Sequence, residues 1–360
     1  MVNAKIKIAI VSHSLGVGGA ERFAGTLSYM LESLGYEIHN IIVNDSVDYH
    51  YAGRLYNLEQ KSASSIGLYK KIKKGFLLRA YLKKNNISVV IDNRTRNYFW
   101  RELMTVMMYR NYKTYYIIHS YNLLNYLPVL PFFGKLLYQN AHKIICVSKA
   151  IQDKVSAQYG LQNTVTIYNP IQEIHIGNLS VQLPEKYILF FGRLDEKVKN
   201  ITLLLEAFKA SEISTKGYQL LILGDGPDRD YLVQTIQKLG LNDVVQLIAF
   251  VKNPFLYVQN ARFTVLSSRY EGFPMSVIES LSLGVPVVSV DCLSGPSEVI
   301  QNEYNGLLVQ NHNTQALGMA LKRMVTENDL FQKCSANAKQ SVAHLTMQKI
   351  AEQWRIILEN

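Results

Sequence analysis

The sequence predicts an α/β protein built from two doubly wound domains that face each other across a cleft. Short apolar runs of strand character alternate with helical patterns along nearly the whole chain, which is typical of parallel sheets covered by helices. The alternation stops once, near the middle, and 360 residues are more than one typical core holds. Ligands of such folds bind where the strands end, so we expect the functional residues in the cleft.

The first domain opens with a strand at Ile6–Val11, a glycine turn at Gly16-Val-Gly18-Gly19 and an apolar-periodic helix that begins at Ala20. Further strands, separated by helical patterns, are predicted at Ile38–Val43, Val89–Ile91, Tyr115–Ile118, Lys143–Val147 and Val165–Ile167. The pattern breaks from Tyr168 to Lys186, where turn-forming residues gather at Asn169-Pro170, Gly177-Asn178 and Pro184. We interpret this break as the linker between the domains.

A second β/α series follows the linker. Its strands are predicted at Tyr187–Phe191, Gln219–Leu223, Val245–Ala249, Phe263–Ser267, Val285–Val290 and Gly306–Val309. Its helices are predicted near Ile201–Lys209, Asp228–Leu239, Pro274–Leu283 and Thr314–Met324. The sequence therefore predicts a second doubly wound domain of similar size.

Composition limits the class of protein. Hydrophobic residues make up 48% and charged residues 18% of the chain, which describes a folded protein. The three cysteines lie far apart and match neither a metal spacing nor a disulfide framework, so we expect reduced thiols in a cytoplasmic protein. The first apolar run is too short for a signal peptide, and no run of about 18 apolar residues predicts a transmembrane helix.

The positive charge is concentrated in the first half. Residues 1–180 hold 21 Lys and Arg against 10 Asp and Glu, and the remaining residues hold 17 against 18. Residues 68–84 carry seven basic residues and no acid, with an apolar stripe at Tyr69, Ile72, Phe76 and Ala80. This basic amphipathic helix either docks on its sheet with a solvated face or binds anionic lipid or a lipid diphosphate. We favour the second interpretation, with Lys70, Lys71 and Lys74 as acceptor-binding candidates.

Two neighbouring features extend this interpretation. Arg94 and Arg96 follow the strand Val89–Ile91 and are candidates to continue the anion site into the cleft. The aromatic-rich stretch 121–133 is too apolar to be freely solvated, and both membrane contact and packing on the first domain remain open. Nucleic acid is not expected as a partner, because no base-stacking module accompanies the charge.

The most informative stretch is Glu271-Gly-Phe-Pro-Met-Ser-Val-Ile-Glu279, which lies between two predicted strands. Gly272 permits a tight turn and Pro274 suits the first turn of a helix. The N–H groups of that turn attract phosphate, and the two carboxylates suit sugar hydroxyls. The pattern favours a nucleotide-sugar site over the alternative of a loop charge and a solvated helix residue.

Two basic residues follow the first strand of the second domain. Arg193 has a planar fork that grips two phosphate oxygens, and Lys199 adds a point charge. The alternative, solvated surface charges, is disfavoured by their position after a strand in the domain that carries Glu271. The glycine turn lacks the third glycine of a dinucleotide fingerprint, because Glu21 takes that place. It is either a loop that a substrate approaches closely or a simple strand–helix turn.

His119 ends the strand Tyr115–Ile118, so its imidazole is placed to meet a substrate hydroxyl or to make a structural hydrogen bond. The aspartates of Asp228-Arg-Asp230 are spaced like a pair of metal-binding carboxylates. They stand at a predicted helix start, however, where carboxylates ordinarily cap the helix or interact with its dipole. The other histidines form no cluster with ligand spacing. We therefore expect chemistry without a metal.

Together these motifs resemble the retaining glycosyltransferases of GT-B fold, in the large family that includes bacterial mannosyl-, glucosyl- and N-acetylhexosaminyltransferases of cell-surface glycans. The resemblance rests on Glu271 and Glu279 around Gly-Phe-Pro, on Gly-Arg193-Leu with Lys199 six residues on, and on Gly-Gly-Ala-Glu-Arg near the start. It spans nearly the whole chain. The second-domain motifs are specific for the fold and the donor class, whereas those of the first domain are less specific.

The resemblance implies roles for these positions. In similar enzymes the positions of Arg193 and Lys199 hold the donor diphosphate, that of Glu271 contacts the hydroxyls of the donor sugar, and that of His119 meets the sugar near its 6-hydroxyl. The position of Glu279 binds the ribose hydroxyls. The other implied donor contacts are Gly18 and Gly19 from the opposite domain and the backbone of Gly272, Phe273, Pro274, Met275 and Ser276.

The resemblance also implies domain roles and an activity. Residues 1–168 with 345–360 would bind the acceptor, with a helix at Met347–Leu358 crossing back onto them, and residues 169–344 would bind the donor. The enzyme would move a hexose or N-acetylhexosamine from a nucleotide-sugar, UDP being the commonest, to a lipid-linked glycan of the lipopolysaccharide or capsule type. It would work on the cytoplasmic face of the membrane, against the inner leaflet, without a cofactor.

No residue is an obvious nucleophile on the far face, so we favour attack on the same face as the leaving group. The family resemblance, rather than the sequence pattern, supports retention of the anomeric configuration. A leaving phosphate oxygen would accept the proton of the acceptor. Two alternatives stay open. A sugar-nucleotide 2-epimerase shares the architecture but would need no acceptor, and a non-catalytic binding protein would release no nucleotide.

Overall fold

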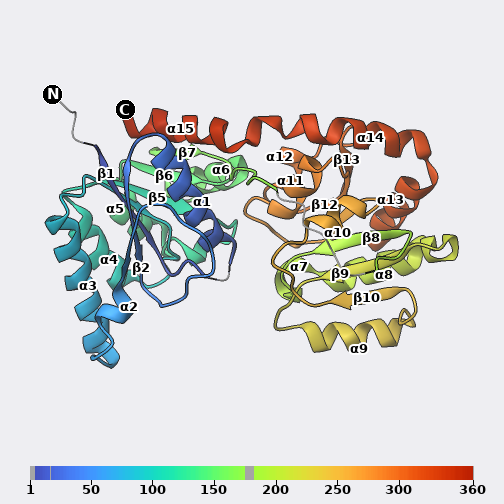
Figure 1. Ribbon diagram of the computed structural model, residues 1–360, viewed down its shortest axis with the longest axis horizontal. Coiled ribbons are helices and arrows are strands. Elements are labelled where there is room, and N and C mark those ends of the chain that lie inside the picture. Colours follow the sequence, from blue (N-terminus) through green and yellow to red (C-terminus); the bar gives the residue numbers. More distant parts are fainter. Residues whose placement is uncertain (1–4, 17, 175–181, 360) are drawn as a thin grey trace. The chain divides into compact units, whose positions relative to one another are not determined.

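The computed structural model describes residues 5–16, 18–174 and 182–359 of the chain. They form two compact units, Met1–Pro170 with Met347–Asn360, and Ile171–Thr346 (Figure 1). Asn169 and Pro170 of the predicted linker stand where the first unit ends. Gly177 and Asn178 lie outside the described residues.

The first unit is built on a parallel sheet of seven strands in the order β3-β2-β1-β4-β5-β6-β7. The strands are β1 (Lys7–Ser12), β2 (Glu37–Ile42), β3 (Arg54–Asn57), β4 (Val89–Asp92), β5 (Lys113–Ile118), β6 (Lys143–Cys146) and β7 (Thr164–Thr166). All four residues of β4 are buried, as expected for a central parallel strand covered on both faces. The strand order changes direction between β1 and β4, which makes this edge the topological switch point.

Helices cover both faces of this sheet (Figure 1). They are α1 (Gly19–Ser33), α2 (Leu58–Lys61), α3 (Gly67–Lys84), α4 (Phe99–Tyr109), α5 (Pro131–Tyr138), α6 (Lys149–Tyr159) and α15 (Met347–Glu359), with a 3₁₀ turn η1 (Leu123–Asn125). Right-handed crossovers put α3 to α6 on one face and α1 on the other. Helix α15 packs against α1 through a buried stripe that includes Trp354. The closing helix thus belongs to the first unit.

The second unit contains a parallel sheet of six strands in the order β10-β9-β8-β11-β12-β13. The strands are β8 (Tyr187–Phe191), β9 (Gln219–Leu223), β10 (Val245–Ile248), β11 (Thr264–Leu266), β12 (Val287–Asp291) and β13 (Gly306–Gln310). The helices are α7 (Glu196–Lys199), α8 (Ile201–Ser211), α9 (Arg229–Leu239), α10 (Phe255–Asn260), α11 (Met275–Ser282), α12 (Pro296–Val299), α13 (Thr314–Thr326) and α14 (Asn328–Ser341), with 3₁₀ turns η2 (Ile213–Lys216) and η3 (Ala343–Leu345).

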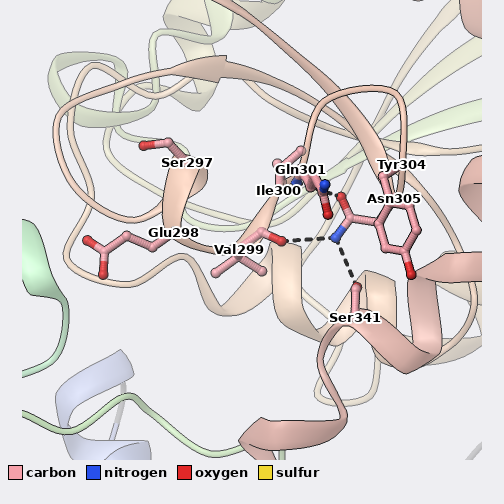
Figure 2. A pocket seen from close by; sticks show the side chains of 8 residues that line it. All are labelled: Ser297, Glu298, Val299, Ile300, Gln301, Tyr304, Asn305 and Ser341. Carbon is pink, nitrogen blue, oxygen red and sulfur yellow. Dashed lines mark hydrogen bonds between the residues drawn. The ribbon is translucent and has the colours of Figure 1, made fainter.

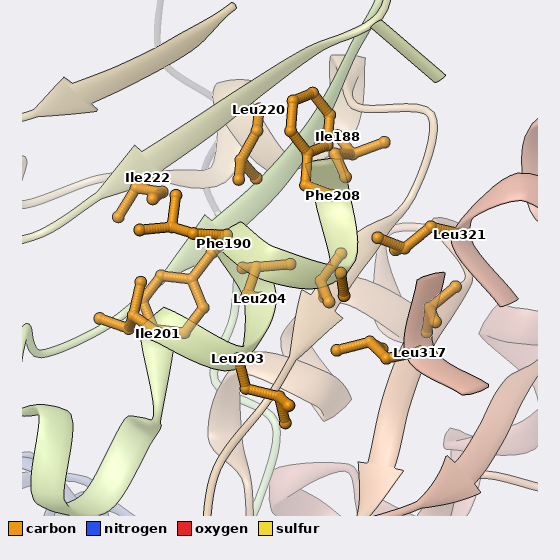
Figure 3. Packing of buried hydrophobic residues seen from close by; sticks show 14 of the residues in the cluster. Ile188, Phe190, Ile201, Leu203, Leu204, Phe208, Leu220, Ile222, Leu317 and Leu321 are labelled. Atoms are coloured by element: carbon orange, nitrogen blue, oxygen red, sulfur yellow. The ribbon is translucent and has the colours of Figure 1, made fainter. Parts of the chain in front are cut away.

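The largest core cluster of the second unit lies between one sheet face and helices α8 and α13 (Figure 3). Ile188 and Phe190 of β8 point into this cluster, whereas Tyr187 and Leu189 belong to a cluster on the opposite face. Every residue of β8 is therefore buried, which explains its continuous apolar sequence. The rigid sheet fixes the positions of the loops that follow its strands.

Phe208 of α8 lies fully buried in this cluster. The substitution Phe208→Ala is expected to lower the free energy of unfolding of the second unit by about 3–5 kcal/mol, because it removes buried apolar area and leaves a cavity. Urea unfolding followed by circular dichroism measures the change. A loss below about 1 kcal/mol would contradict this packing.

The predicted fold class, two Rossmann-like α/β domains, is confirmed. All the predicted strands are present with ends shifted by at most two residues. The edge strand β3, the helix α14 and the short helices α7, α10 and α12 were not predicted. None of the helices among the described residues is long and apolar enough to cross a bilayer.

Candidate functional site

In the second unit the switch point lies at β8, which has β9 on one side and β11 on the other. The loops after β8 and β9 approach closely at two glycines. A Cβ on Gly224 would lie 1.9 Å from the carbonyl oxygen of Gly192, and Gly224 has a φ of 152°. The close approach therefore requires glycine at 224. This contact holds the start of the loop after β8, which carries Arg193, against the loop after β9.

Lys199 and Glu271 meet at this switch point. Lys199 Nζ donates to Glu271 Oε1 over 2.6 Å, and Ser268 Oγ donates to the same oxygen over 2.6 Å. Both charged side chains are largely buried. Lys199 ends α7 and Glu271 follows β11, so the structure brings together two residues that lie 72 positions apart in the sequence.

Arg193 stands in the same loop as Lys199, directly after Gly192. Its side chain is exposed, and a Cβ built on Gly192 would lie 4.0 Å from Lys199 Cε. Arg193, with its fork of N–H donors, thus leaves the carboxyl end of β8 in the loop that leads to Lys199, whose ammonium group meets the carboxylate of Glu271. This arrangement can hold an oxyanion beside a hydroxyl-bearing group.

The Gly272–Ser276 segment leads from Glu271 into α11. Pro274 stands at the N-cap rather than inside the first turn. Its carbonyl accepts from the N–H groups of Val277 and Ile278, which leaves those of Met275 and Ser276 as first-turn donors without an intrahelical partner. Glu279 is buried on α11. The helix start therefore presents donors beside the Lys199–Glu271 pair.

The loop after β12 packs against the segment from Glu271 to Pro274 and hydrogen-bonds to it. Ser294 Oγ donates to the carbonyl of Gly272 over 2.8 Å, and Glu271 N–H donates to the carbonyl of Leu293 over 3.1 Å. A Cβ on Gly295 would lie 2.4 Å from Pro274 Cδ, so only glycine fits there. Ser268, Ser294 and Gly295 were not predicted, and their common signal is that each follows a strand end.

In the first unit, His119 is held by an asparagine that sequence reasoning missed. His119 Nε2 lies 2.6 Å from Asn93 Oδ1, and Asn93 Nδ2 donates to the carbonyl of Ala20 over 2.8 Å. Because the amide nitrogen of Asn93 faces that carbonyl, its oxygen must face the imidazole, and His119 Nε2 therefore carries the proton. The Phe23 ring packs against the imidazole in an edge-to-face arrangement, with the two ring centroids 5.1 Å apart.

Burial and, to a lesser extent, the Arg96 guanidinium lower the pKa of His119 to about 3. The imidazole is therefore neutral at pH 7. With Nε2 donating to Asn93, its Nδ1 atom is an acceptor, which suits a ligand hydroxyl better than a phosphate.

The substitution Asn93→Ala is expected to lower the turnover number by about 10²-fold, because the imidazole loses the group that fixes its orientation. The dissociation constant of the donor is expected to change little. Steady-state rates and donor binding by calorimetry measure the two effects separately. Equal losses in both would show that Asn93 only supports the fold.

The glycine turn lies at the start of α1. A Cβ on Gly18 would lie 2.2 Å from Glu21 Oε2, and Gly18 has a φ of 137°. Burial raises the pKa of Glu21. Gly18 is therefore required by the local conformation, whereas a Cβ on Gly19 would meet open space.

The structure corrects the prediction for Arg94 and Arg96, because both are buried inside the first unit. Arg94 Nη2 donates to Asp92 Oδ2 over 2.5 Å. Arg96 donates to the carbonyls of Asp92, Arg94 and Ile117 over 3.2, 2.9 and 3.0 Å. Neither guanidinium is available to an acceptor, and both hold the segment after β4 in place.

The candidates on α3 divide into two groups. Lys70 and Lys74 both bind Glu59, and Lys74 also donates to the carbonyl of Val43 over 2.6 Å. These hydrogen bonds, from Lys70 first and Lys74 second, lower the pKa of Glu59. Lys71 is exposed. Only Lys71 of the three is thus presented to a partner without breaking an ion pair.

The apolar stripe of α3 does not dock on the sheet. Leu78 and Leu82 form the buried face, and the predicted stripe residues Tyr69, Ile72 and Phe76 are exposed. Asp228, expected to act as a helix cap, does so for another helix. Its Oδ2 accepts from the N–H of Glu196 over 2.7 Å, at the start of α7.

Two hollows on the second unit are lined neither by Lys199 nor by Glu271. One of about 430 Å³ is lined by residues around Asn305, and one of about 390 Å³ borders Arg269. The buried amide of Asn305 donates to the Val299 carbonyl and to Ser341 Oγ, each over 2.9 Å (Figure 2). Both N–H groups of the amide are engaged in hydrogen bonds that hold this loop to α12 and α14. We therefore assign the hollow no ligand.

Known proteins of the same architecture identify the class. Anabaena HepE, solved with UDP and glucose, superimposes with a TM-score of 0.78 at 17% identity, covering 99% of this chain and 100% of its own. Two relatives come from Campylobacter jejuni. An N-acetylgalactosamine-N,N'-diacetylbacillosaminyl-diphospho-undecaprenol 4-alpha-N-acetylgalactosaminyltransferase is 32% identical over 96% of this chain and 97% of its own length. A second diphospho-undecaprenol-dependent alpha-1,4-N-acetyl-D-galactosaminyltransferase is 26% identical over 97% of each chain.

The class defined by this fold is the GT-B glycosyltransferases. Residues 171–341 match the model of glycosyl transferases group 1, and residues 17–173 match that of Glycosyltransferase Family 4. The chain belongs to this GT-B family and is a glycosyltransferase.

Proposed function

We propose that the chain is a retaining transferase that moves a hexose or N-acetylhexosamine from a UDP-sugar to a glycan carried on a polyprenyl diphosphate. The observation that carries the proposal is the ion pair of Lys199 and Glu271 at the switch point, with Arg193 in the loop that leads to Lys199. A diphosphate needs cations and N–H donors, and a sugar needs a hydroxyl acceptor. Both kinds of group are gathered there.

The chemistry follows from the charges that develop. When the bond between the anomeric carbon and the diphosphate oxygen breaks, its electrons leave with the diphosphate and the sugar becomes oxocarbenium-like. Arg193, Lys199 and the first-turn N–H groups of α11 would stabilise the departing charge, a contribution that is usually large. Glu271 would hold the sugar hydroxyls, and Glu279 those of the ribose.

Retention is proposed because the motifs around Arg193, Lys199, Glu271 and Glu279 resemble those of the retaining GT-B glycosyltransferases. The acceptor hydroxyl attacks the anomeric carbon from the face that the diphosphate leaves, and its proton passes to a leaving phosphate oxygen. Neutral His119 would accept a hydrogen bond from a sugar hydroxyl. No metal or cofactor is needed in this scheme.

The acceptor class is taken from the relatives. Both Campylobacter enzymes are named for acceptors on diphospho-undecaprenol, and the first unit of this chain carries the basic helix α3. We therefore propose a polyprenyl-diphosphate acceptor, reached at the cytoplasmic face of the membrane. Of the candidates Lys70, Lys71 and Lys74, Lys71 is the exposed one that is not held in the ion pairs with Glu59.

The test is UDP release from a panel of UDP-sugars, each with and without an undecaprenyl-diphosphate glycan. We expect release with one donor, only when acceptor is present, and an α-linked product by NMR. An epimerised sugar formed without acceptor would identify the 2-epimerase instead, and an inverted product would overturn retention. Thermal unfolding with each donor gives an independent readout of binding.

A further inference from the structure

Helix α4 buries polar side chains and exposes apolar ones, the reverse of an ordinary surface helix. Its buried positions include the polar residues Glu102 and Thr105. The side chains of Trp100, Met104 and Met107, which share one face at i, i+4 and i+7, are 75%, 65% and 69% exposed. A surface helix ordinarily buries its apolar stripe and exposes its polar face. The apolar stripe of α4 is therefore available to a partner.

The start of α5 continues this stripe. Val129, Leu130 and Phe132 are exposed, and the Phe99 and Phe133 rings join the two helices with their centroids 4.8 Å apart. We call the combined patch the α4–α5 apolar surface, made up of Trp100, Met104, Met107, Val129, Leu130 and Phe132. Continuous exposed apolar surfaces of this kind mark docking sites.

The charges around this surface all have one sign. Between residues 66 and 140 the only carboxylates are those of Asp92 and Glu102, and both are buried. Every exposed charge in this range belongs to Lys or Arg, including Arg110 and Lys135. Helix α3, with its exposed lysines and its exposed apolar stripe, lies on the same sheet face. The partner must be apolar and anionic at once.

We propose that the α4–α5 apolar surface inserts into the headgroup and acyl boundary of an anionic phospholipid bilayer, with the lysines of α3 against the headgroups. Tryptophan, methionine and phenylalanine beside Lys and Arg fit that boundary. A second copy of the chain fits poorly, because two such surfaces would bring like charges together. The inference deepens the proposed function by placing the enzyme on the bilayer that carries its acceptor.

The chain supplies its own reporter for insertion. It has two tryptophans, Trp100 and Trp354, and Trp354 is fully buried. Vesicles of phosphatidylglycerol and phosphatidylcholine are therefore expected to shift tryptophan emission to the blue through Trp100 alone. Lipids brominated in the acyl chain are expected to quench it. Vesicles of phosphatidylcholine alone should give a much weaker effect, since they lack the anionic headgroups.

The matched variants separate insertion from other causes. The triple variant Trp100→Ser, Met104→Ser, Phe132→Ser is expected to lower partition into anionic vesicles by at least about 10-fold, through lost apolar burial. A control, Phe250→Ser with Met319→Ser, removes side chains that are 65% and 63% exposed on the second unit. It is expected to bind vesicles as the wild type does.

Other outcomes are equally decisive. Unchanged partition of the triple variant, absent quenching, or a wild-type dimer that the triple substitution dissociates would each overturn the membrane inference. Transfer to a short-chain, water-soluble prenyl-diphosphate acceptor should be the same in the wild type and the triple variant. If the wild type fails in that assay while binding vesicles, the proposed function fails and the membrane surface stands.

Discussion

Lys199→Met is expected to lower transfer by about 10²–10³-fold, because the departing diphosphate loses a preorganised cation. The same change should destabilise the second unit by about 1–3 kcal/mol, since Glu271 would keep Ser268 as a partner but lose the ammonium. Activity and stability thus fall together in this single variant. Rate measurements and urea unfolding give the two numbers.

A second substitution separates the two effects. Adding Glu271→Gln to Lys199→Met removes the unpaired carboxylate and keeps the shape of the side chain, so most of the lost stability is expected to return. Transfer is expected to stay at the level of the single variant or below. A double variant that regains both stability and transfer would show that the pair serves the fold alone. Arg193→Ala, at an exposed side chain, should lower transfer without a change in stability.

The central strands could be predicted because they are buried on both faces. In β8 all five residues are apolar and buried, and its predicted ends are those of the structure. The edge strand β3 has four residues, Arg54 exposed and only Asn57 buried, so no apolar run marks it. Helix α14 buries only Cys334 and Ala338, and its apolar periodicity is correspondingly faint.

Site residues could be predicted where they follow a strand of the second domain, which carries the motif from Glu271 to Glu279. Lys199 and Glu271 were found in this way, and they meet. The pairing itself was not foreseen, because sequence gives positions along strands but not which side chains reach each other. Asn93 was missed since nothing distinguishes it from other polar residues after strands. The positioning role of Asn93 follows from the structure, in which its amide bridges His119 and the carbonyl of Ala20.

The prediction for Arg94 and Arg96 failed because the sequence does not show which side chains reach each other. Arg94 and Arg96 also follow a strand, but their partners come from elsewhere in the first unit. Glu102 of α4 lies 3.8 Å from Arg94, and the rings of Tyr116, Tyr126 and Tyr138 surround the Arg96 guanidinium at 5.1, 5.5 and 5.8 Å. These aromatic rings are scattered through the sequence, so no local pattern reveals a buried guanidinium site.

This buried cluster of Asp92, Arg94 and Arg96 gives a large expected effect on stability. Asp92→Asn keeps the shape of the side chain but removes the carboxylate that pairs with Arg94 and lies 3.9 Å from Arg96. Arg96 would lose its counter-charge and Arg94 would keep only the more distant carboxylate of Glu102, and breaking such buried pairs typically costs about 3–5 kcal/mol. The first unit is expected to unfold at correspondingly lower urea concentration. Lys149→Met, which breaks an exposed pair with Asp153, should change stability little.

The pH dependence of unfolding tests the cause of this loss. Burial alone would raise the pKa of Asp92, but the Arg94 guanidinium, followed by Arg96, holds it below its usual value of 3.8. A carboxyl with a lowered folded pKa stabilises the protein fully above its unfolded pKa and loses that contribution as pH falls through the folded value. Below about pH 4 the wild type should therefore lose stability more steeply than Asp92→Asn. Parallel curves would mean that Asp92 is not the group that titrates.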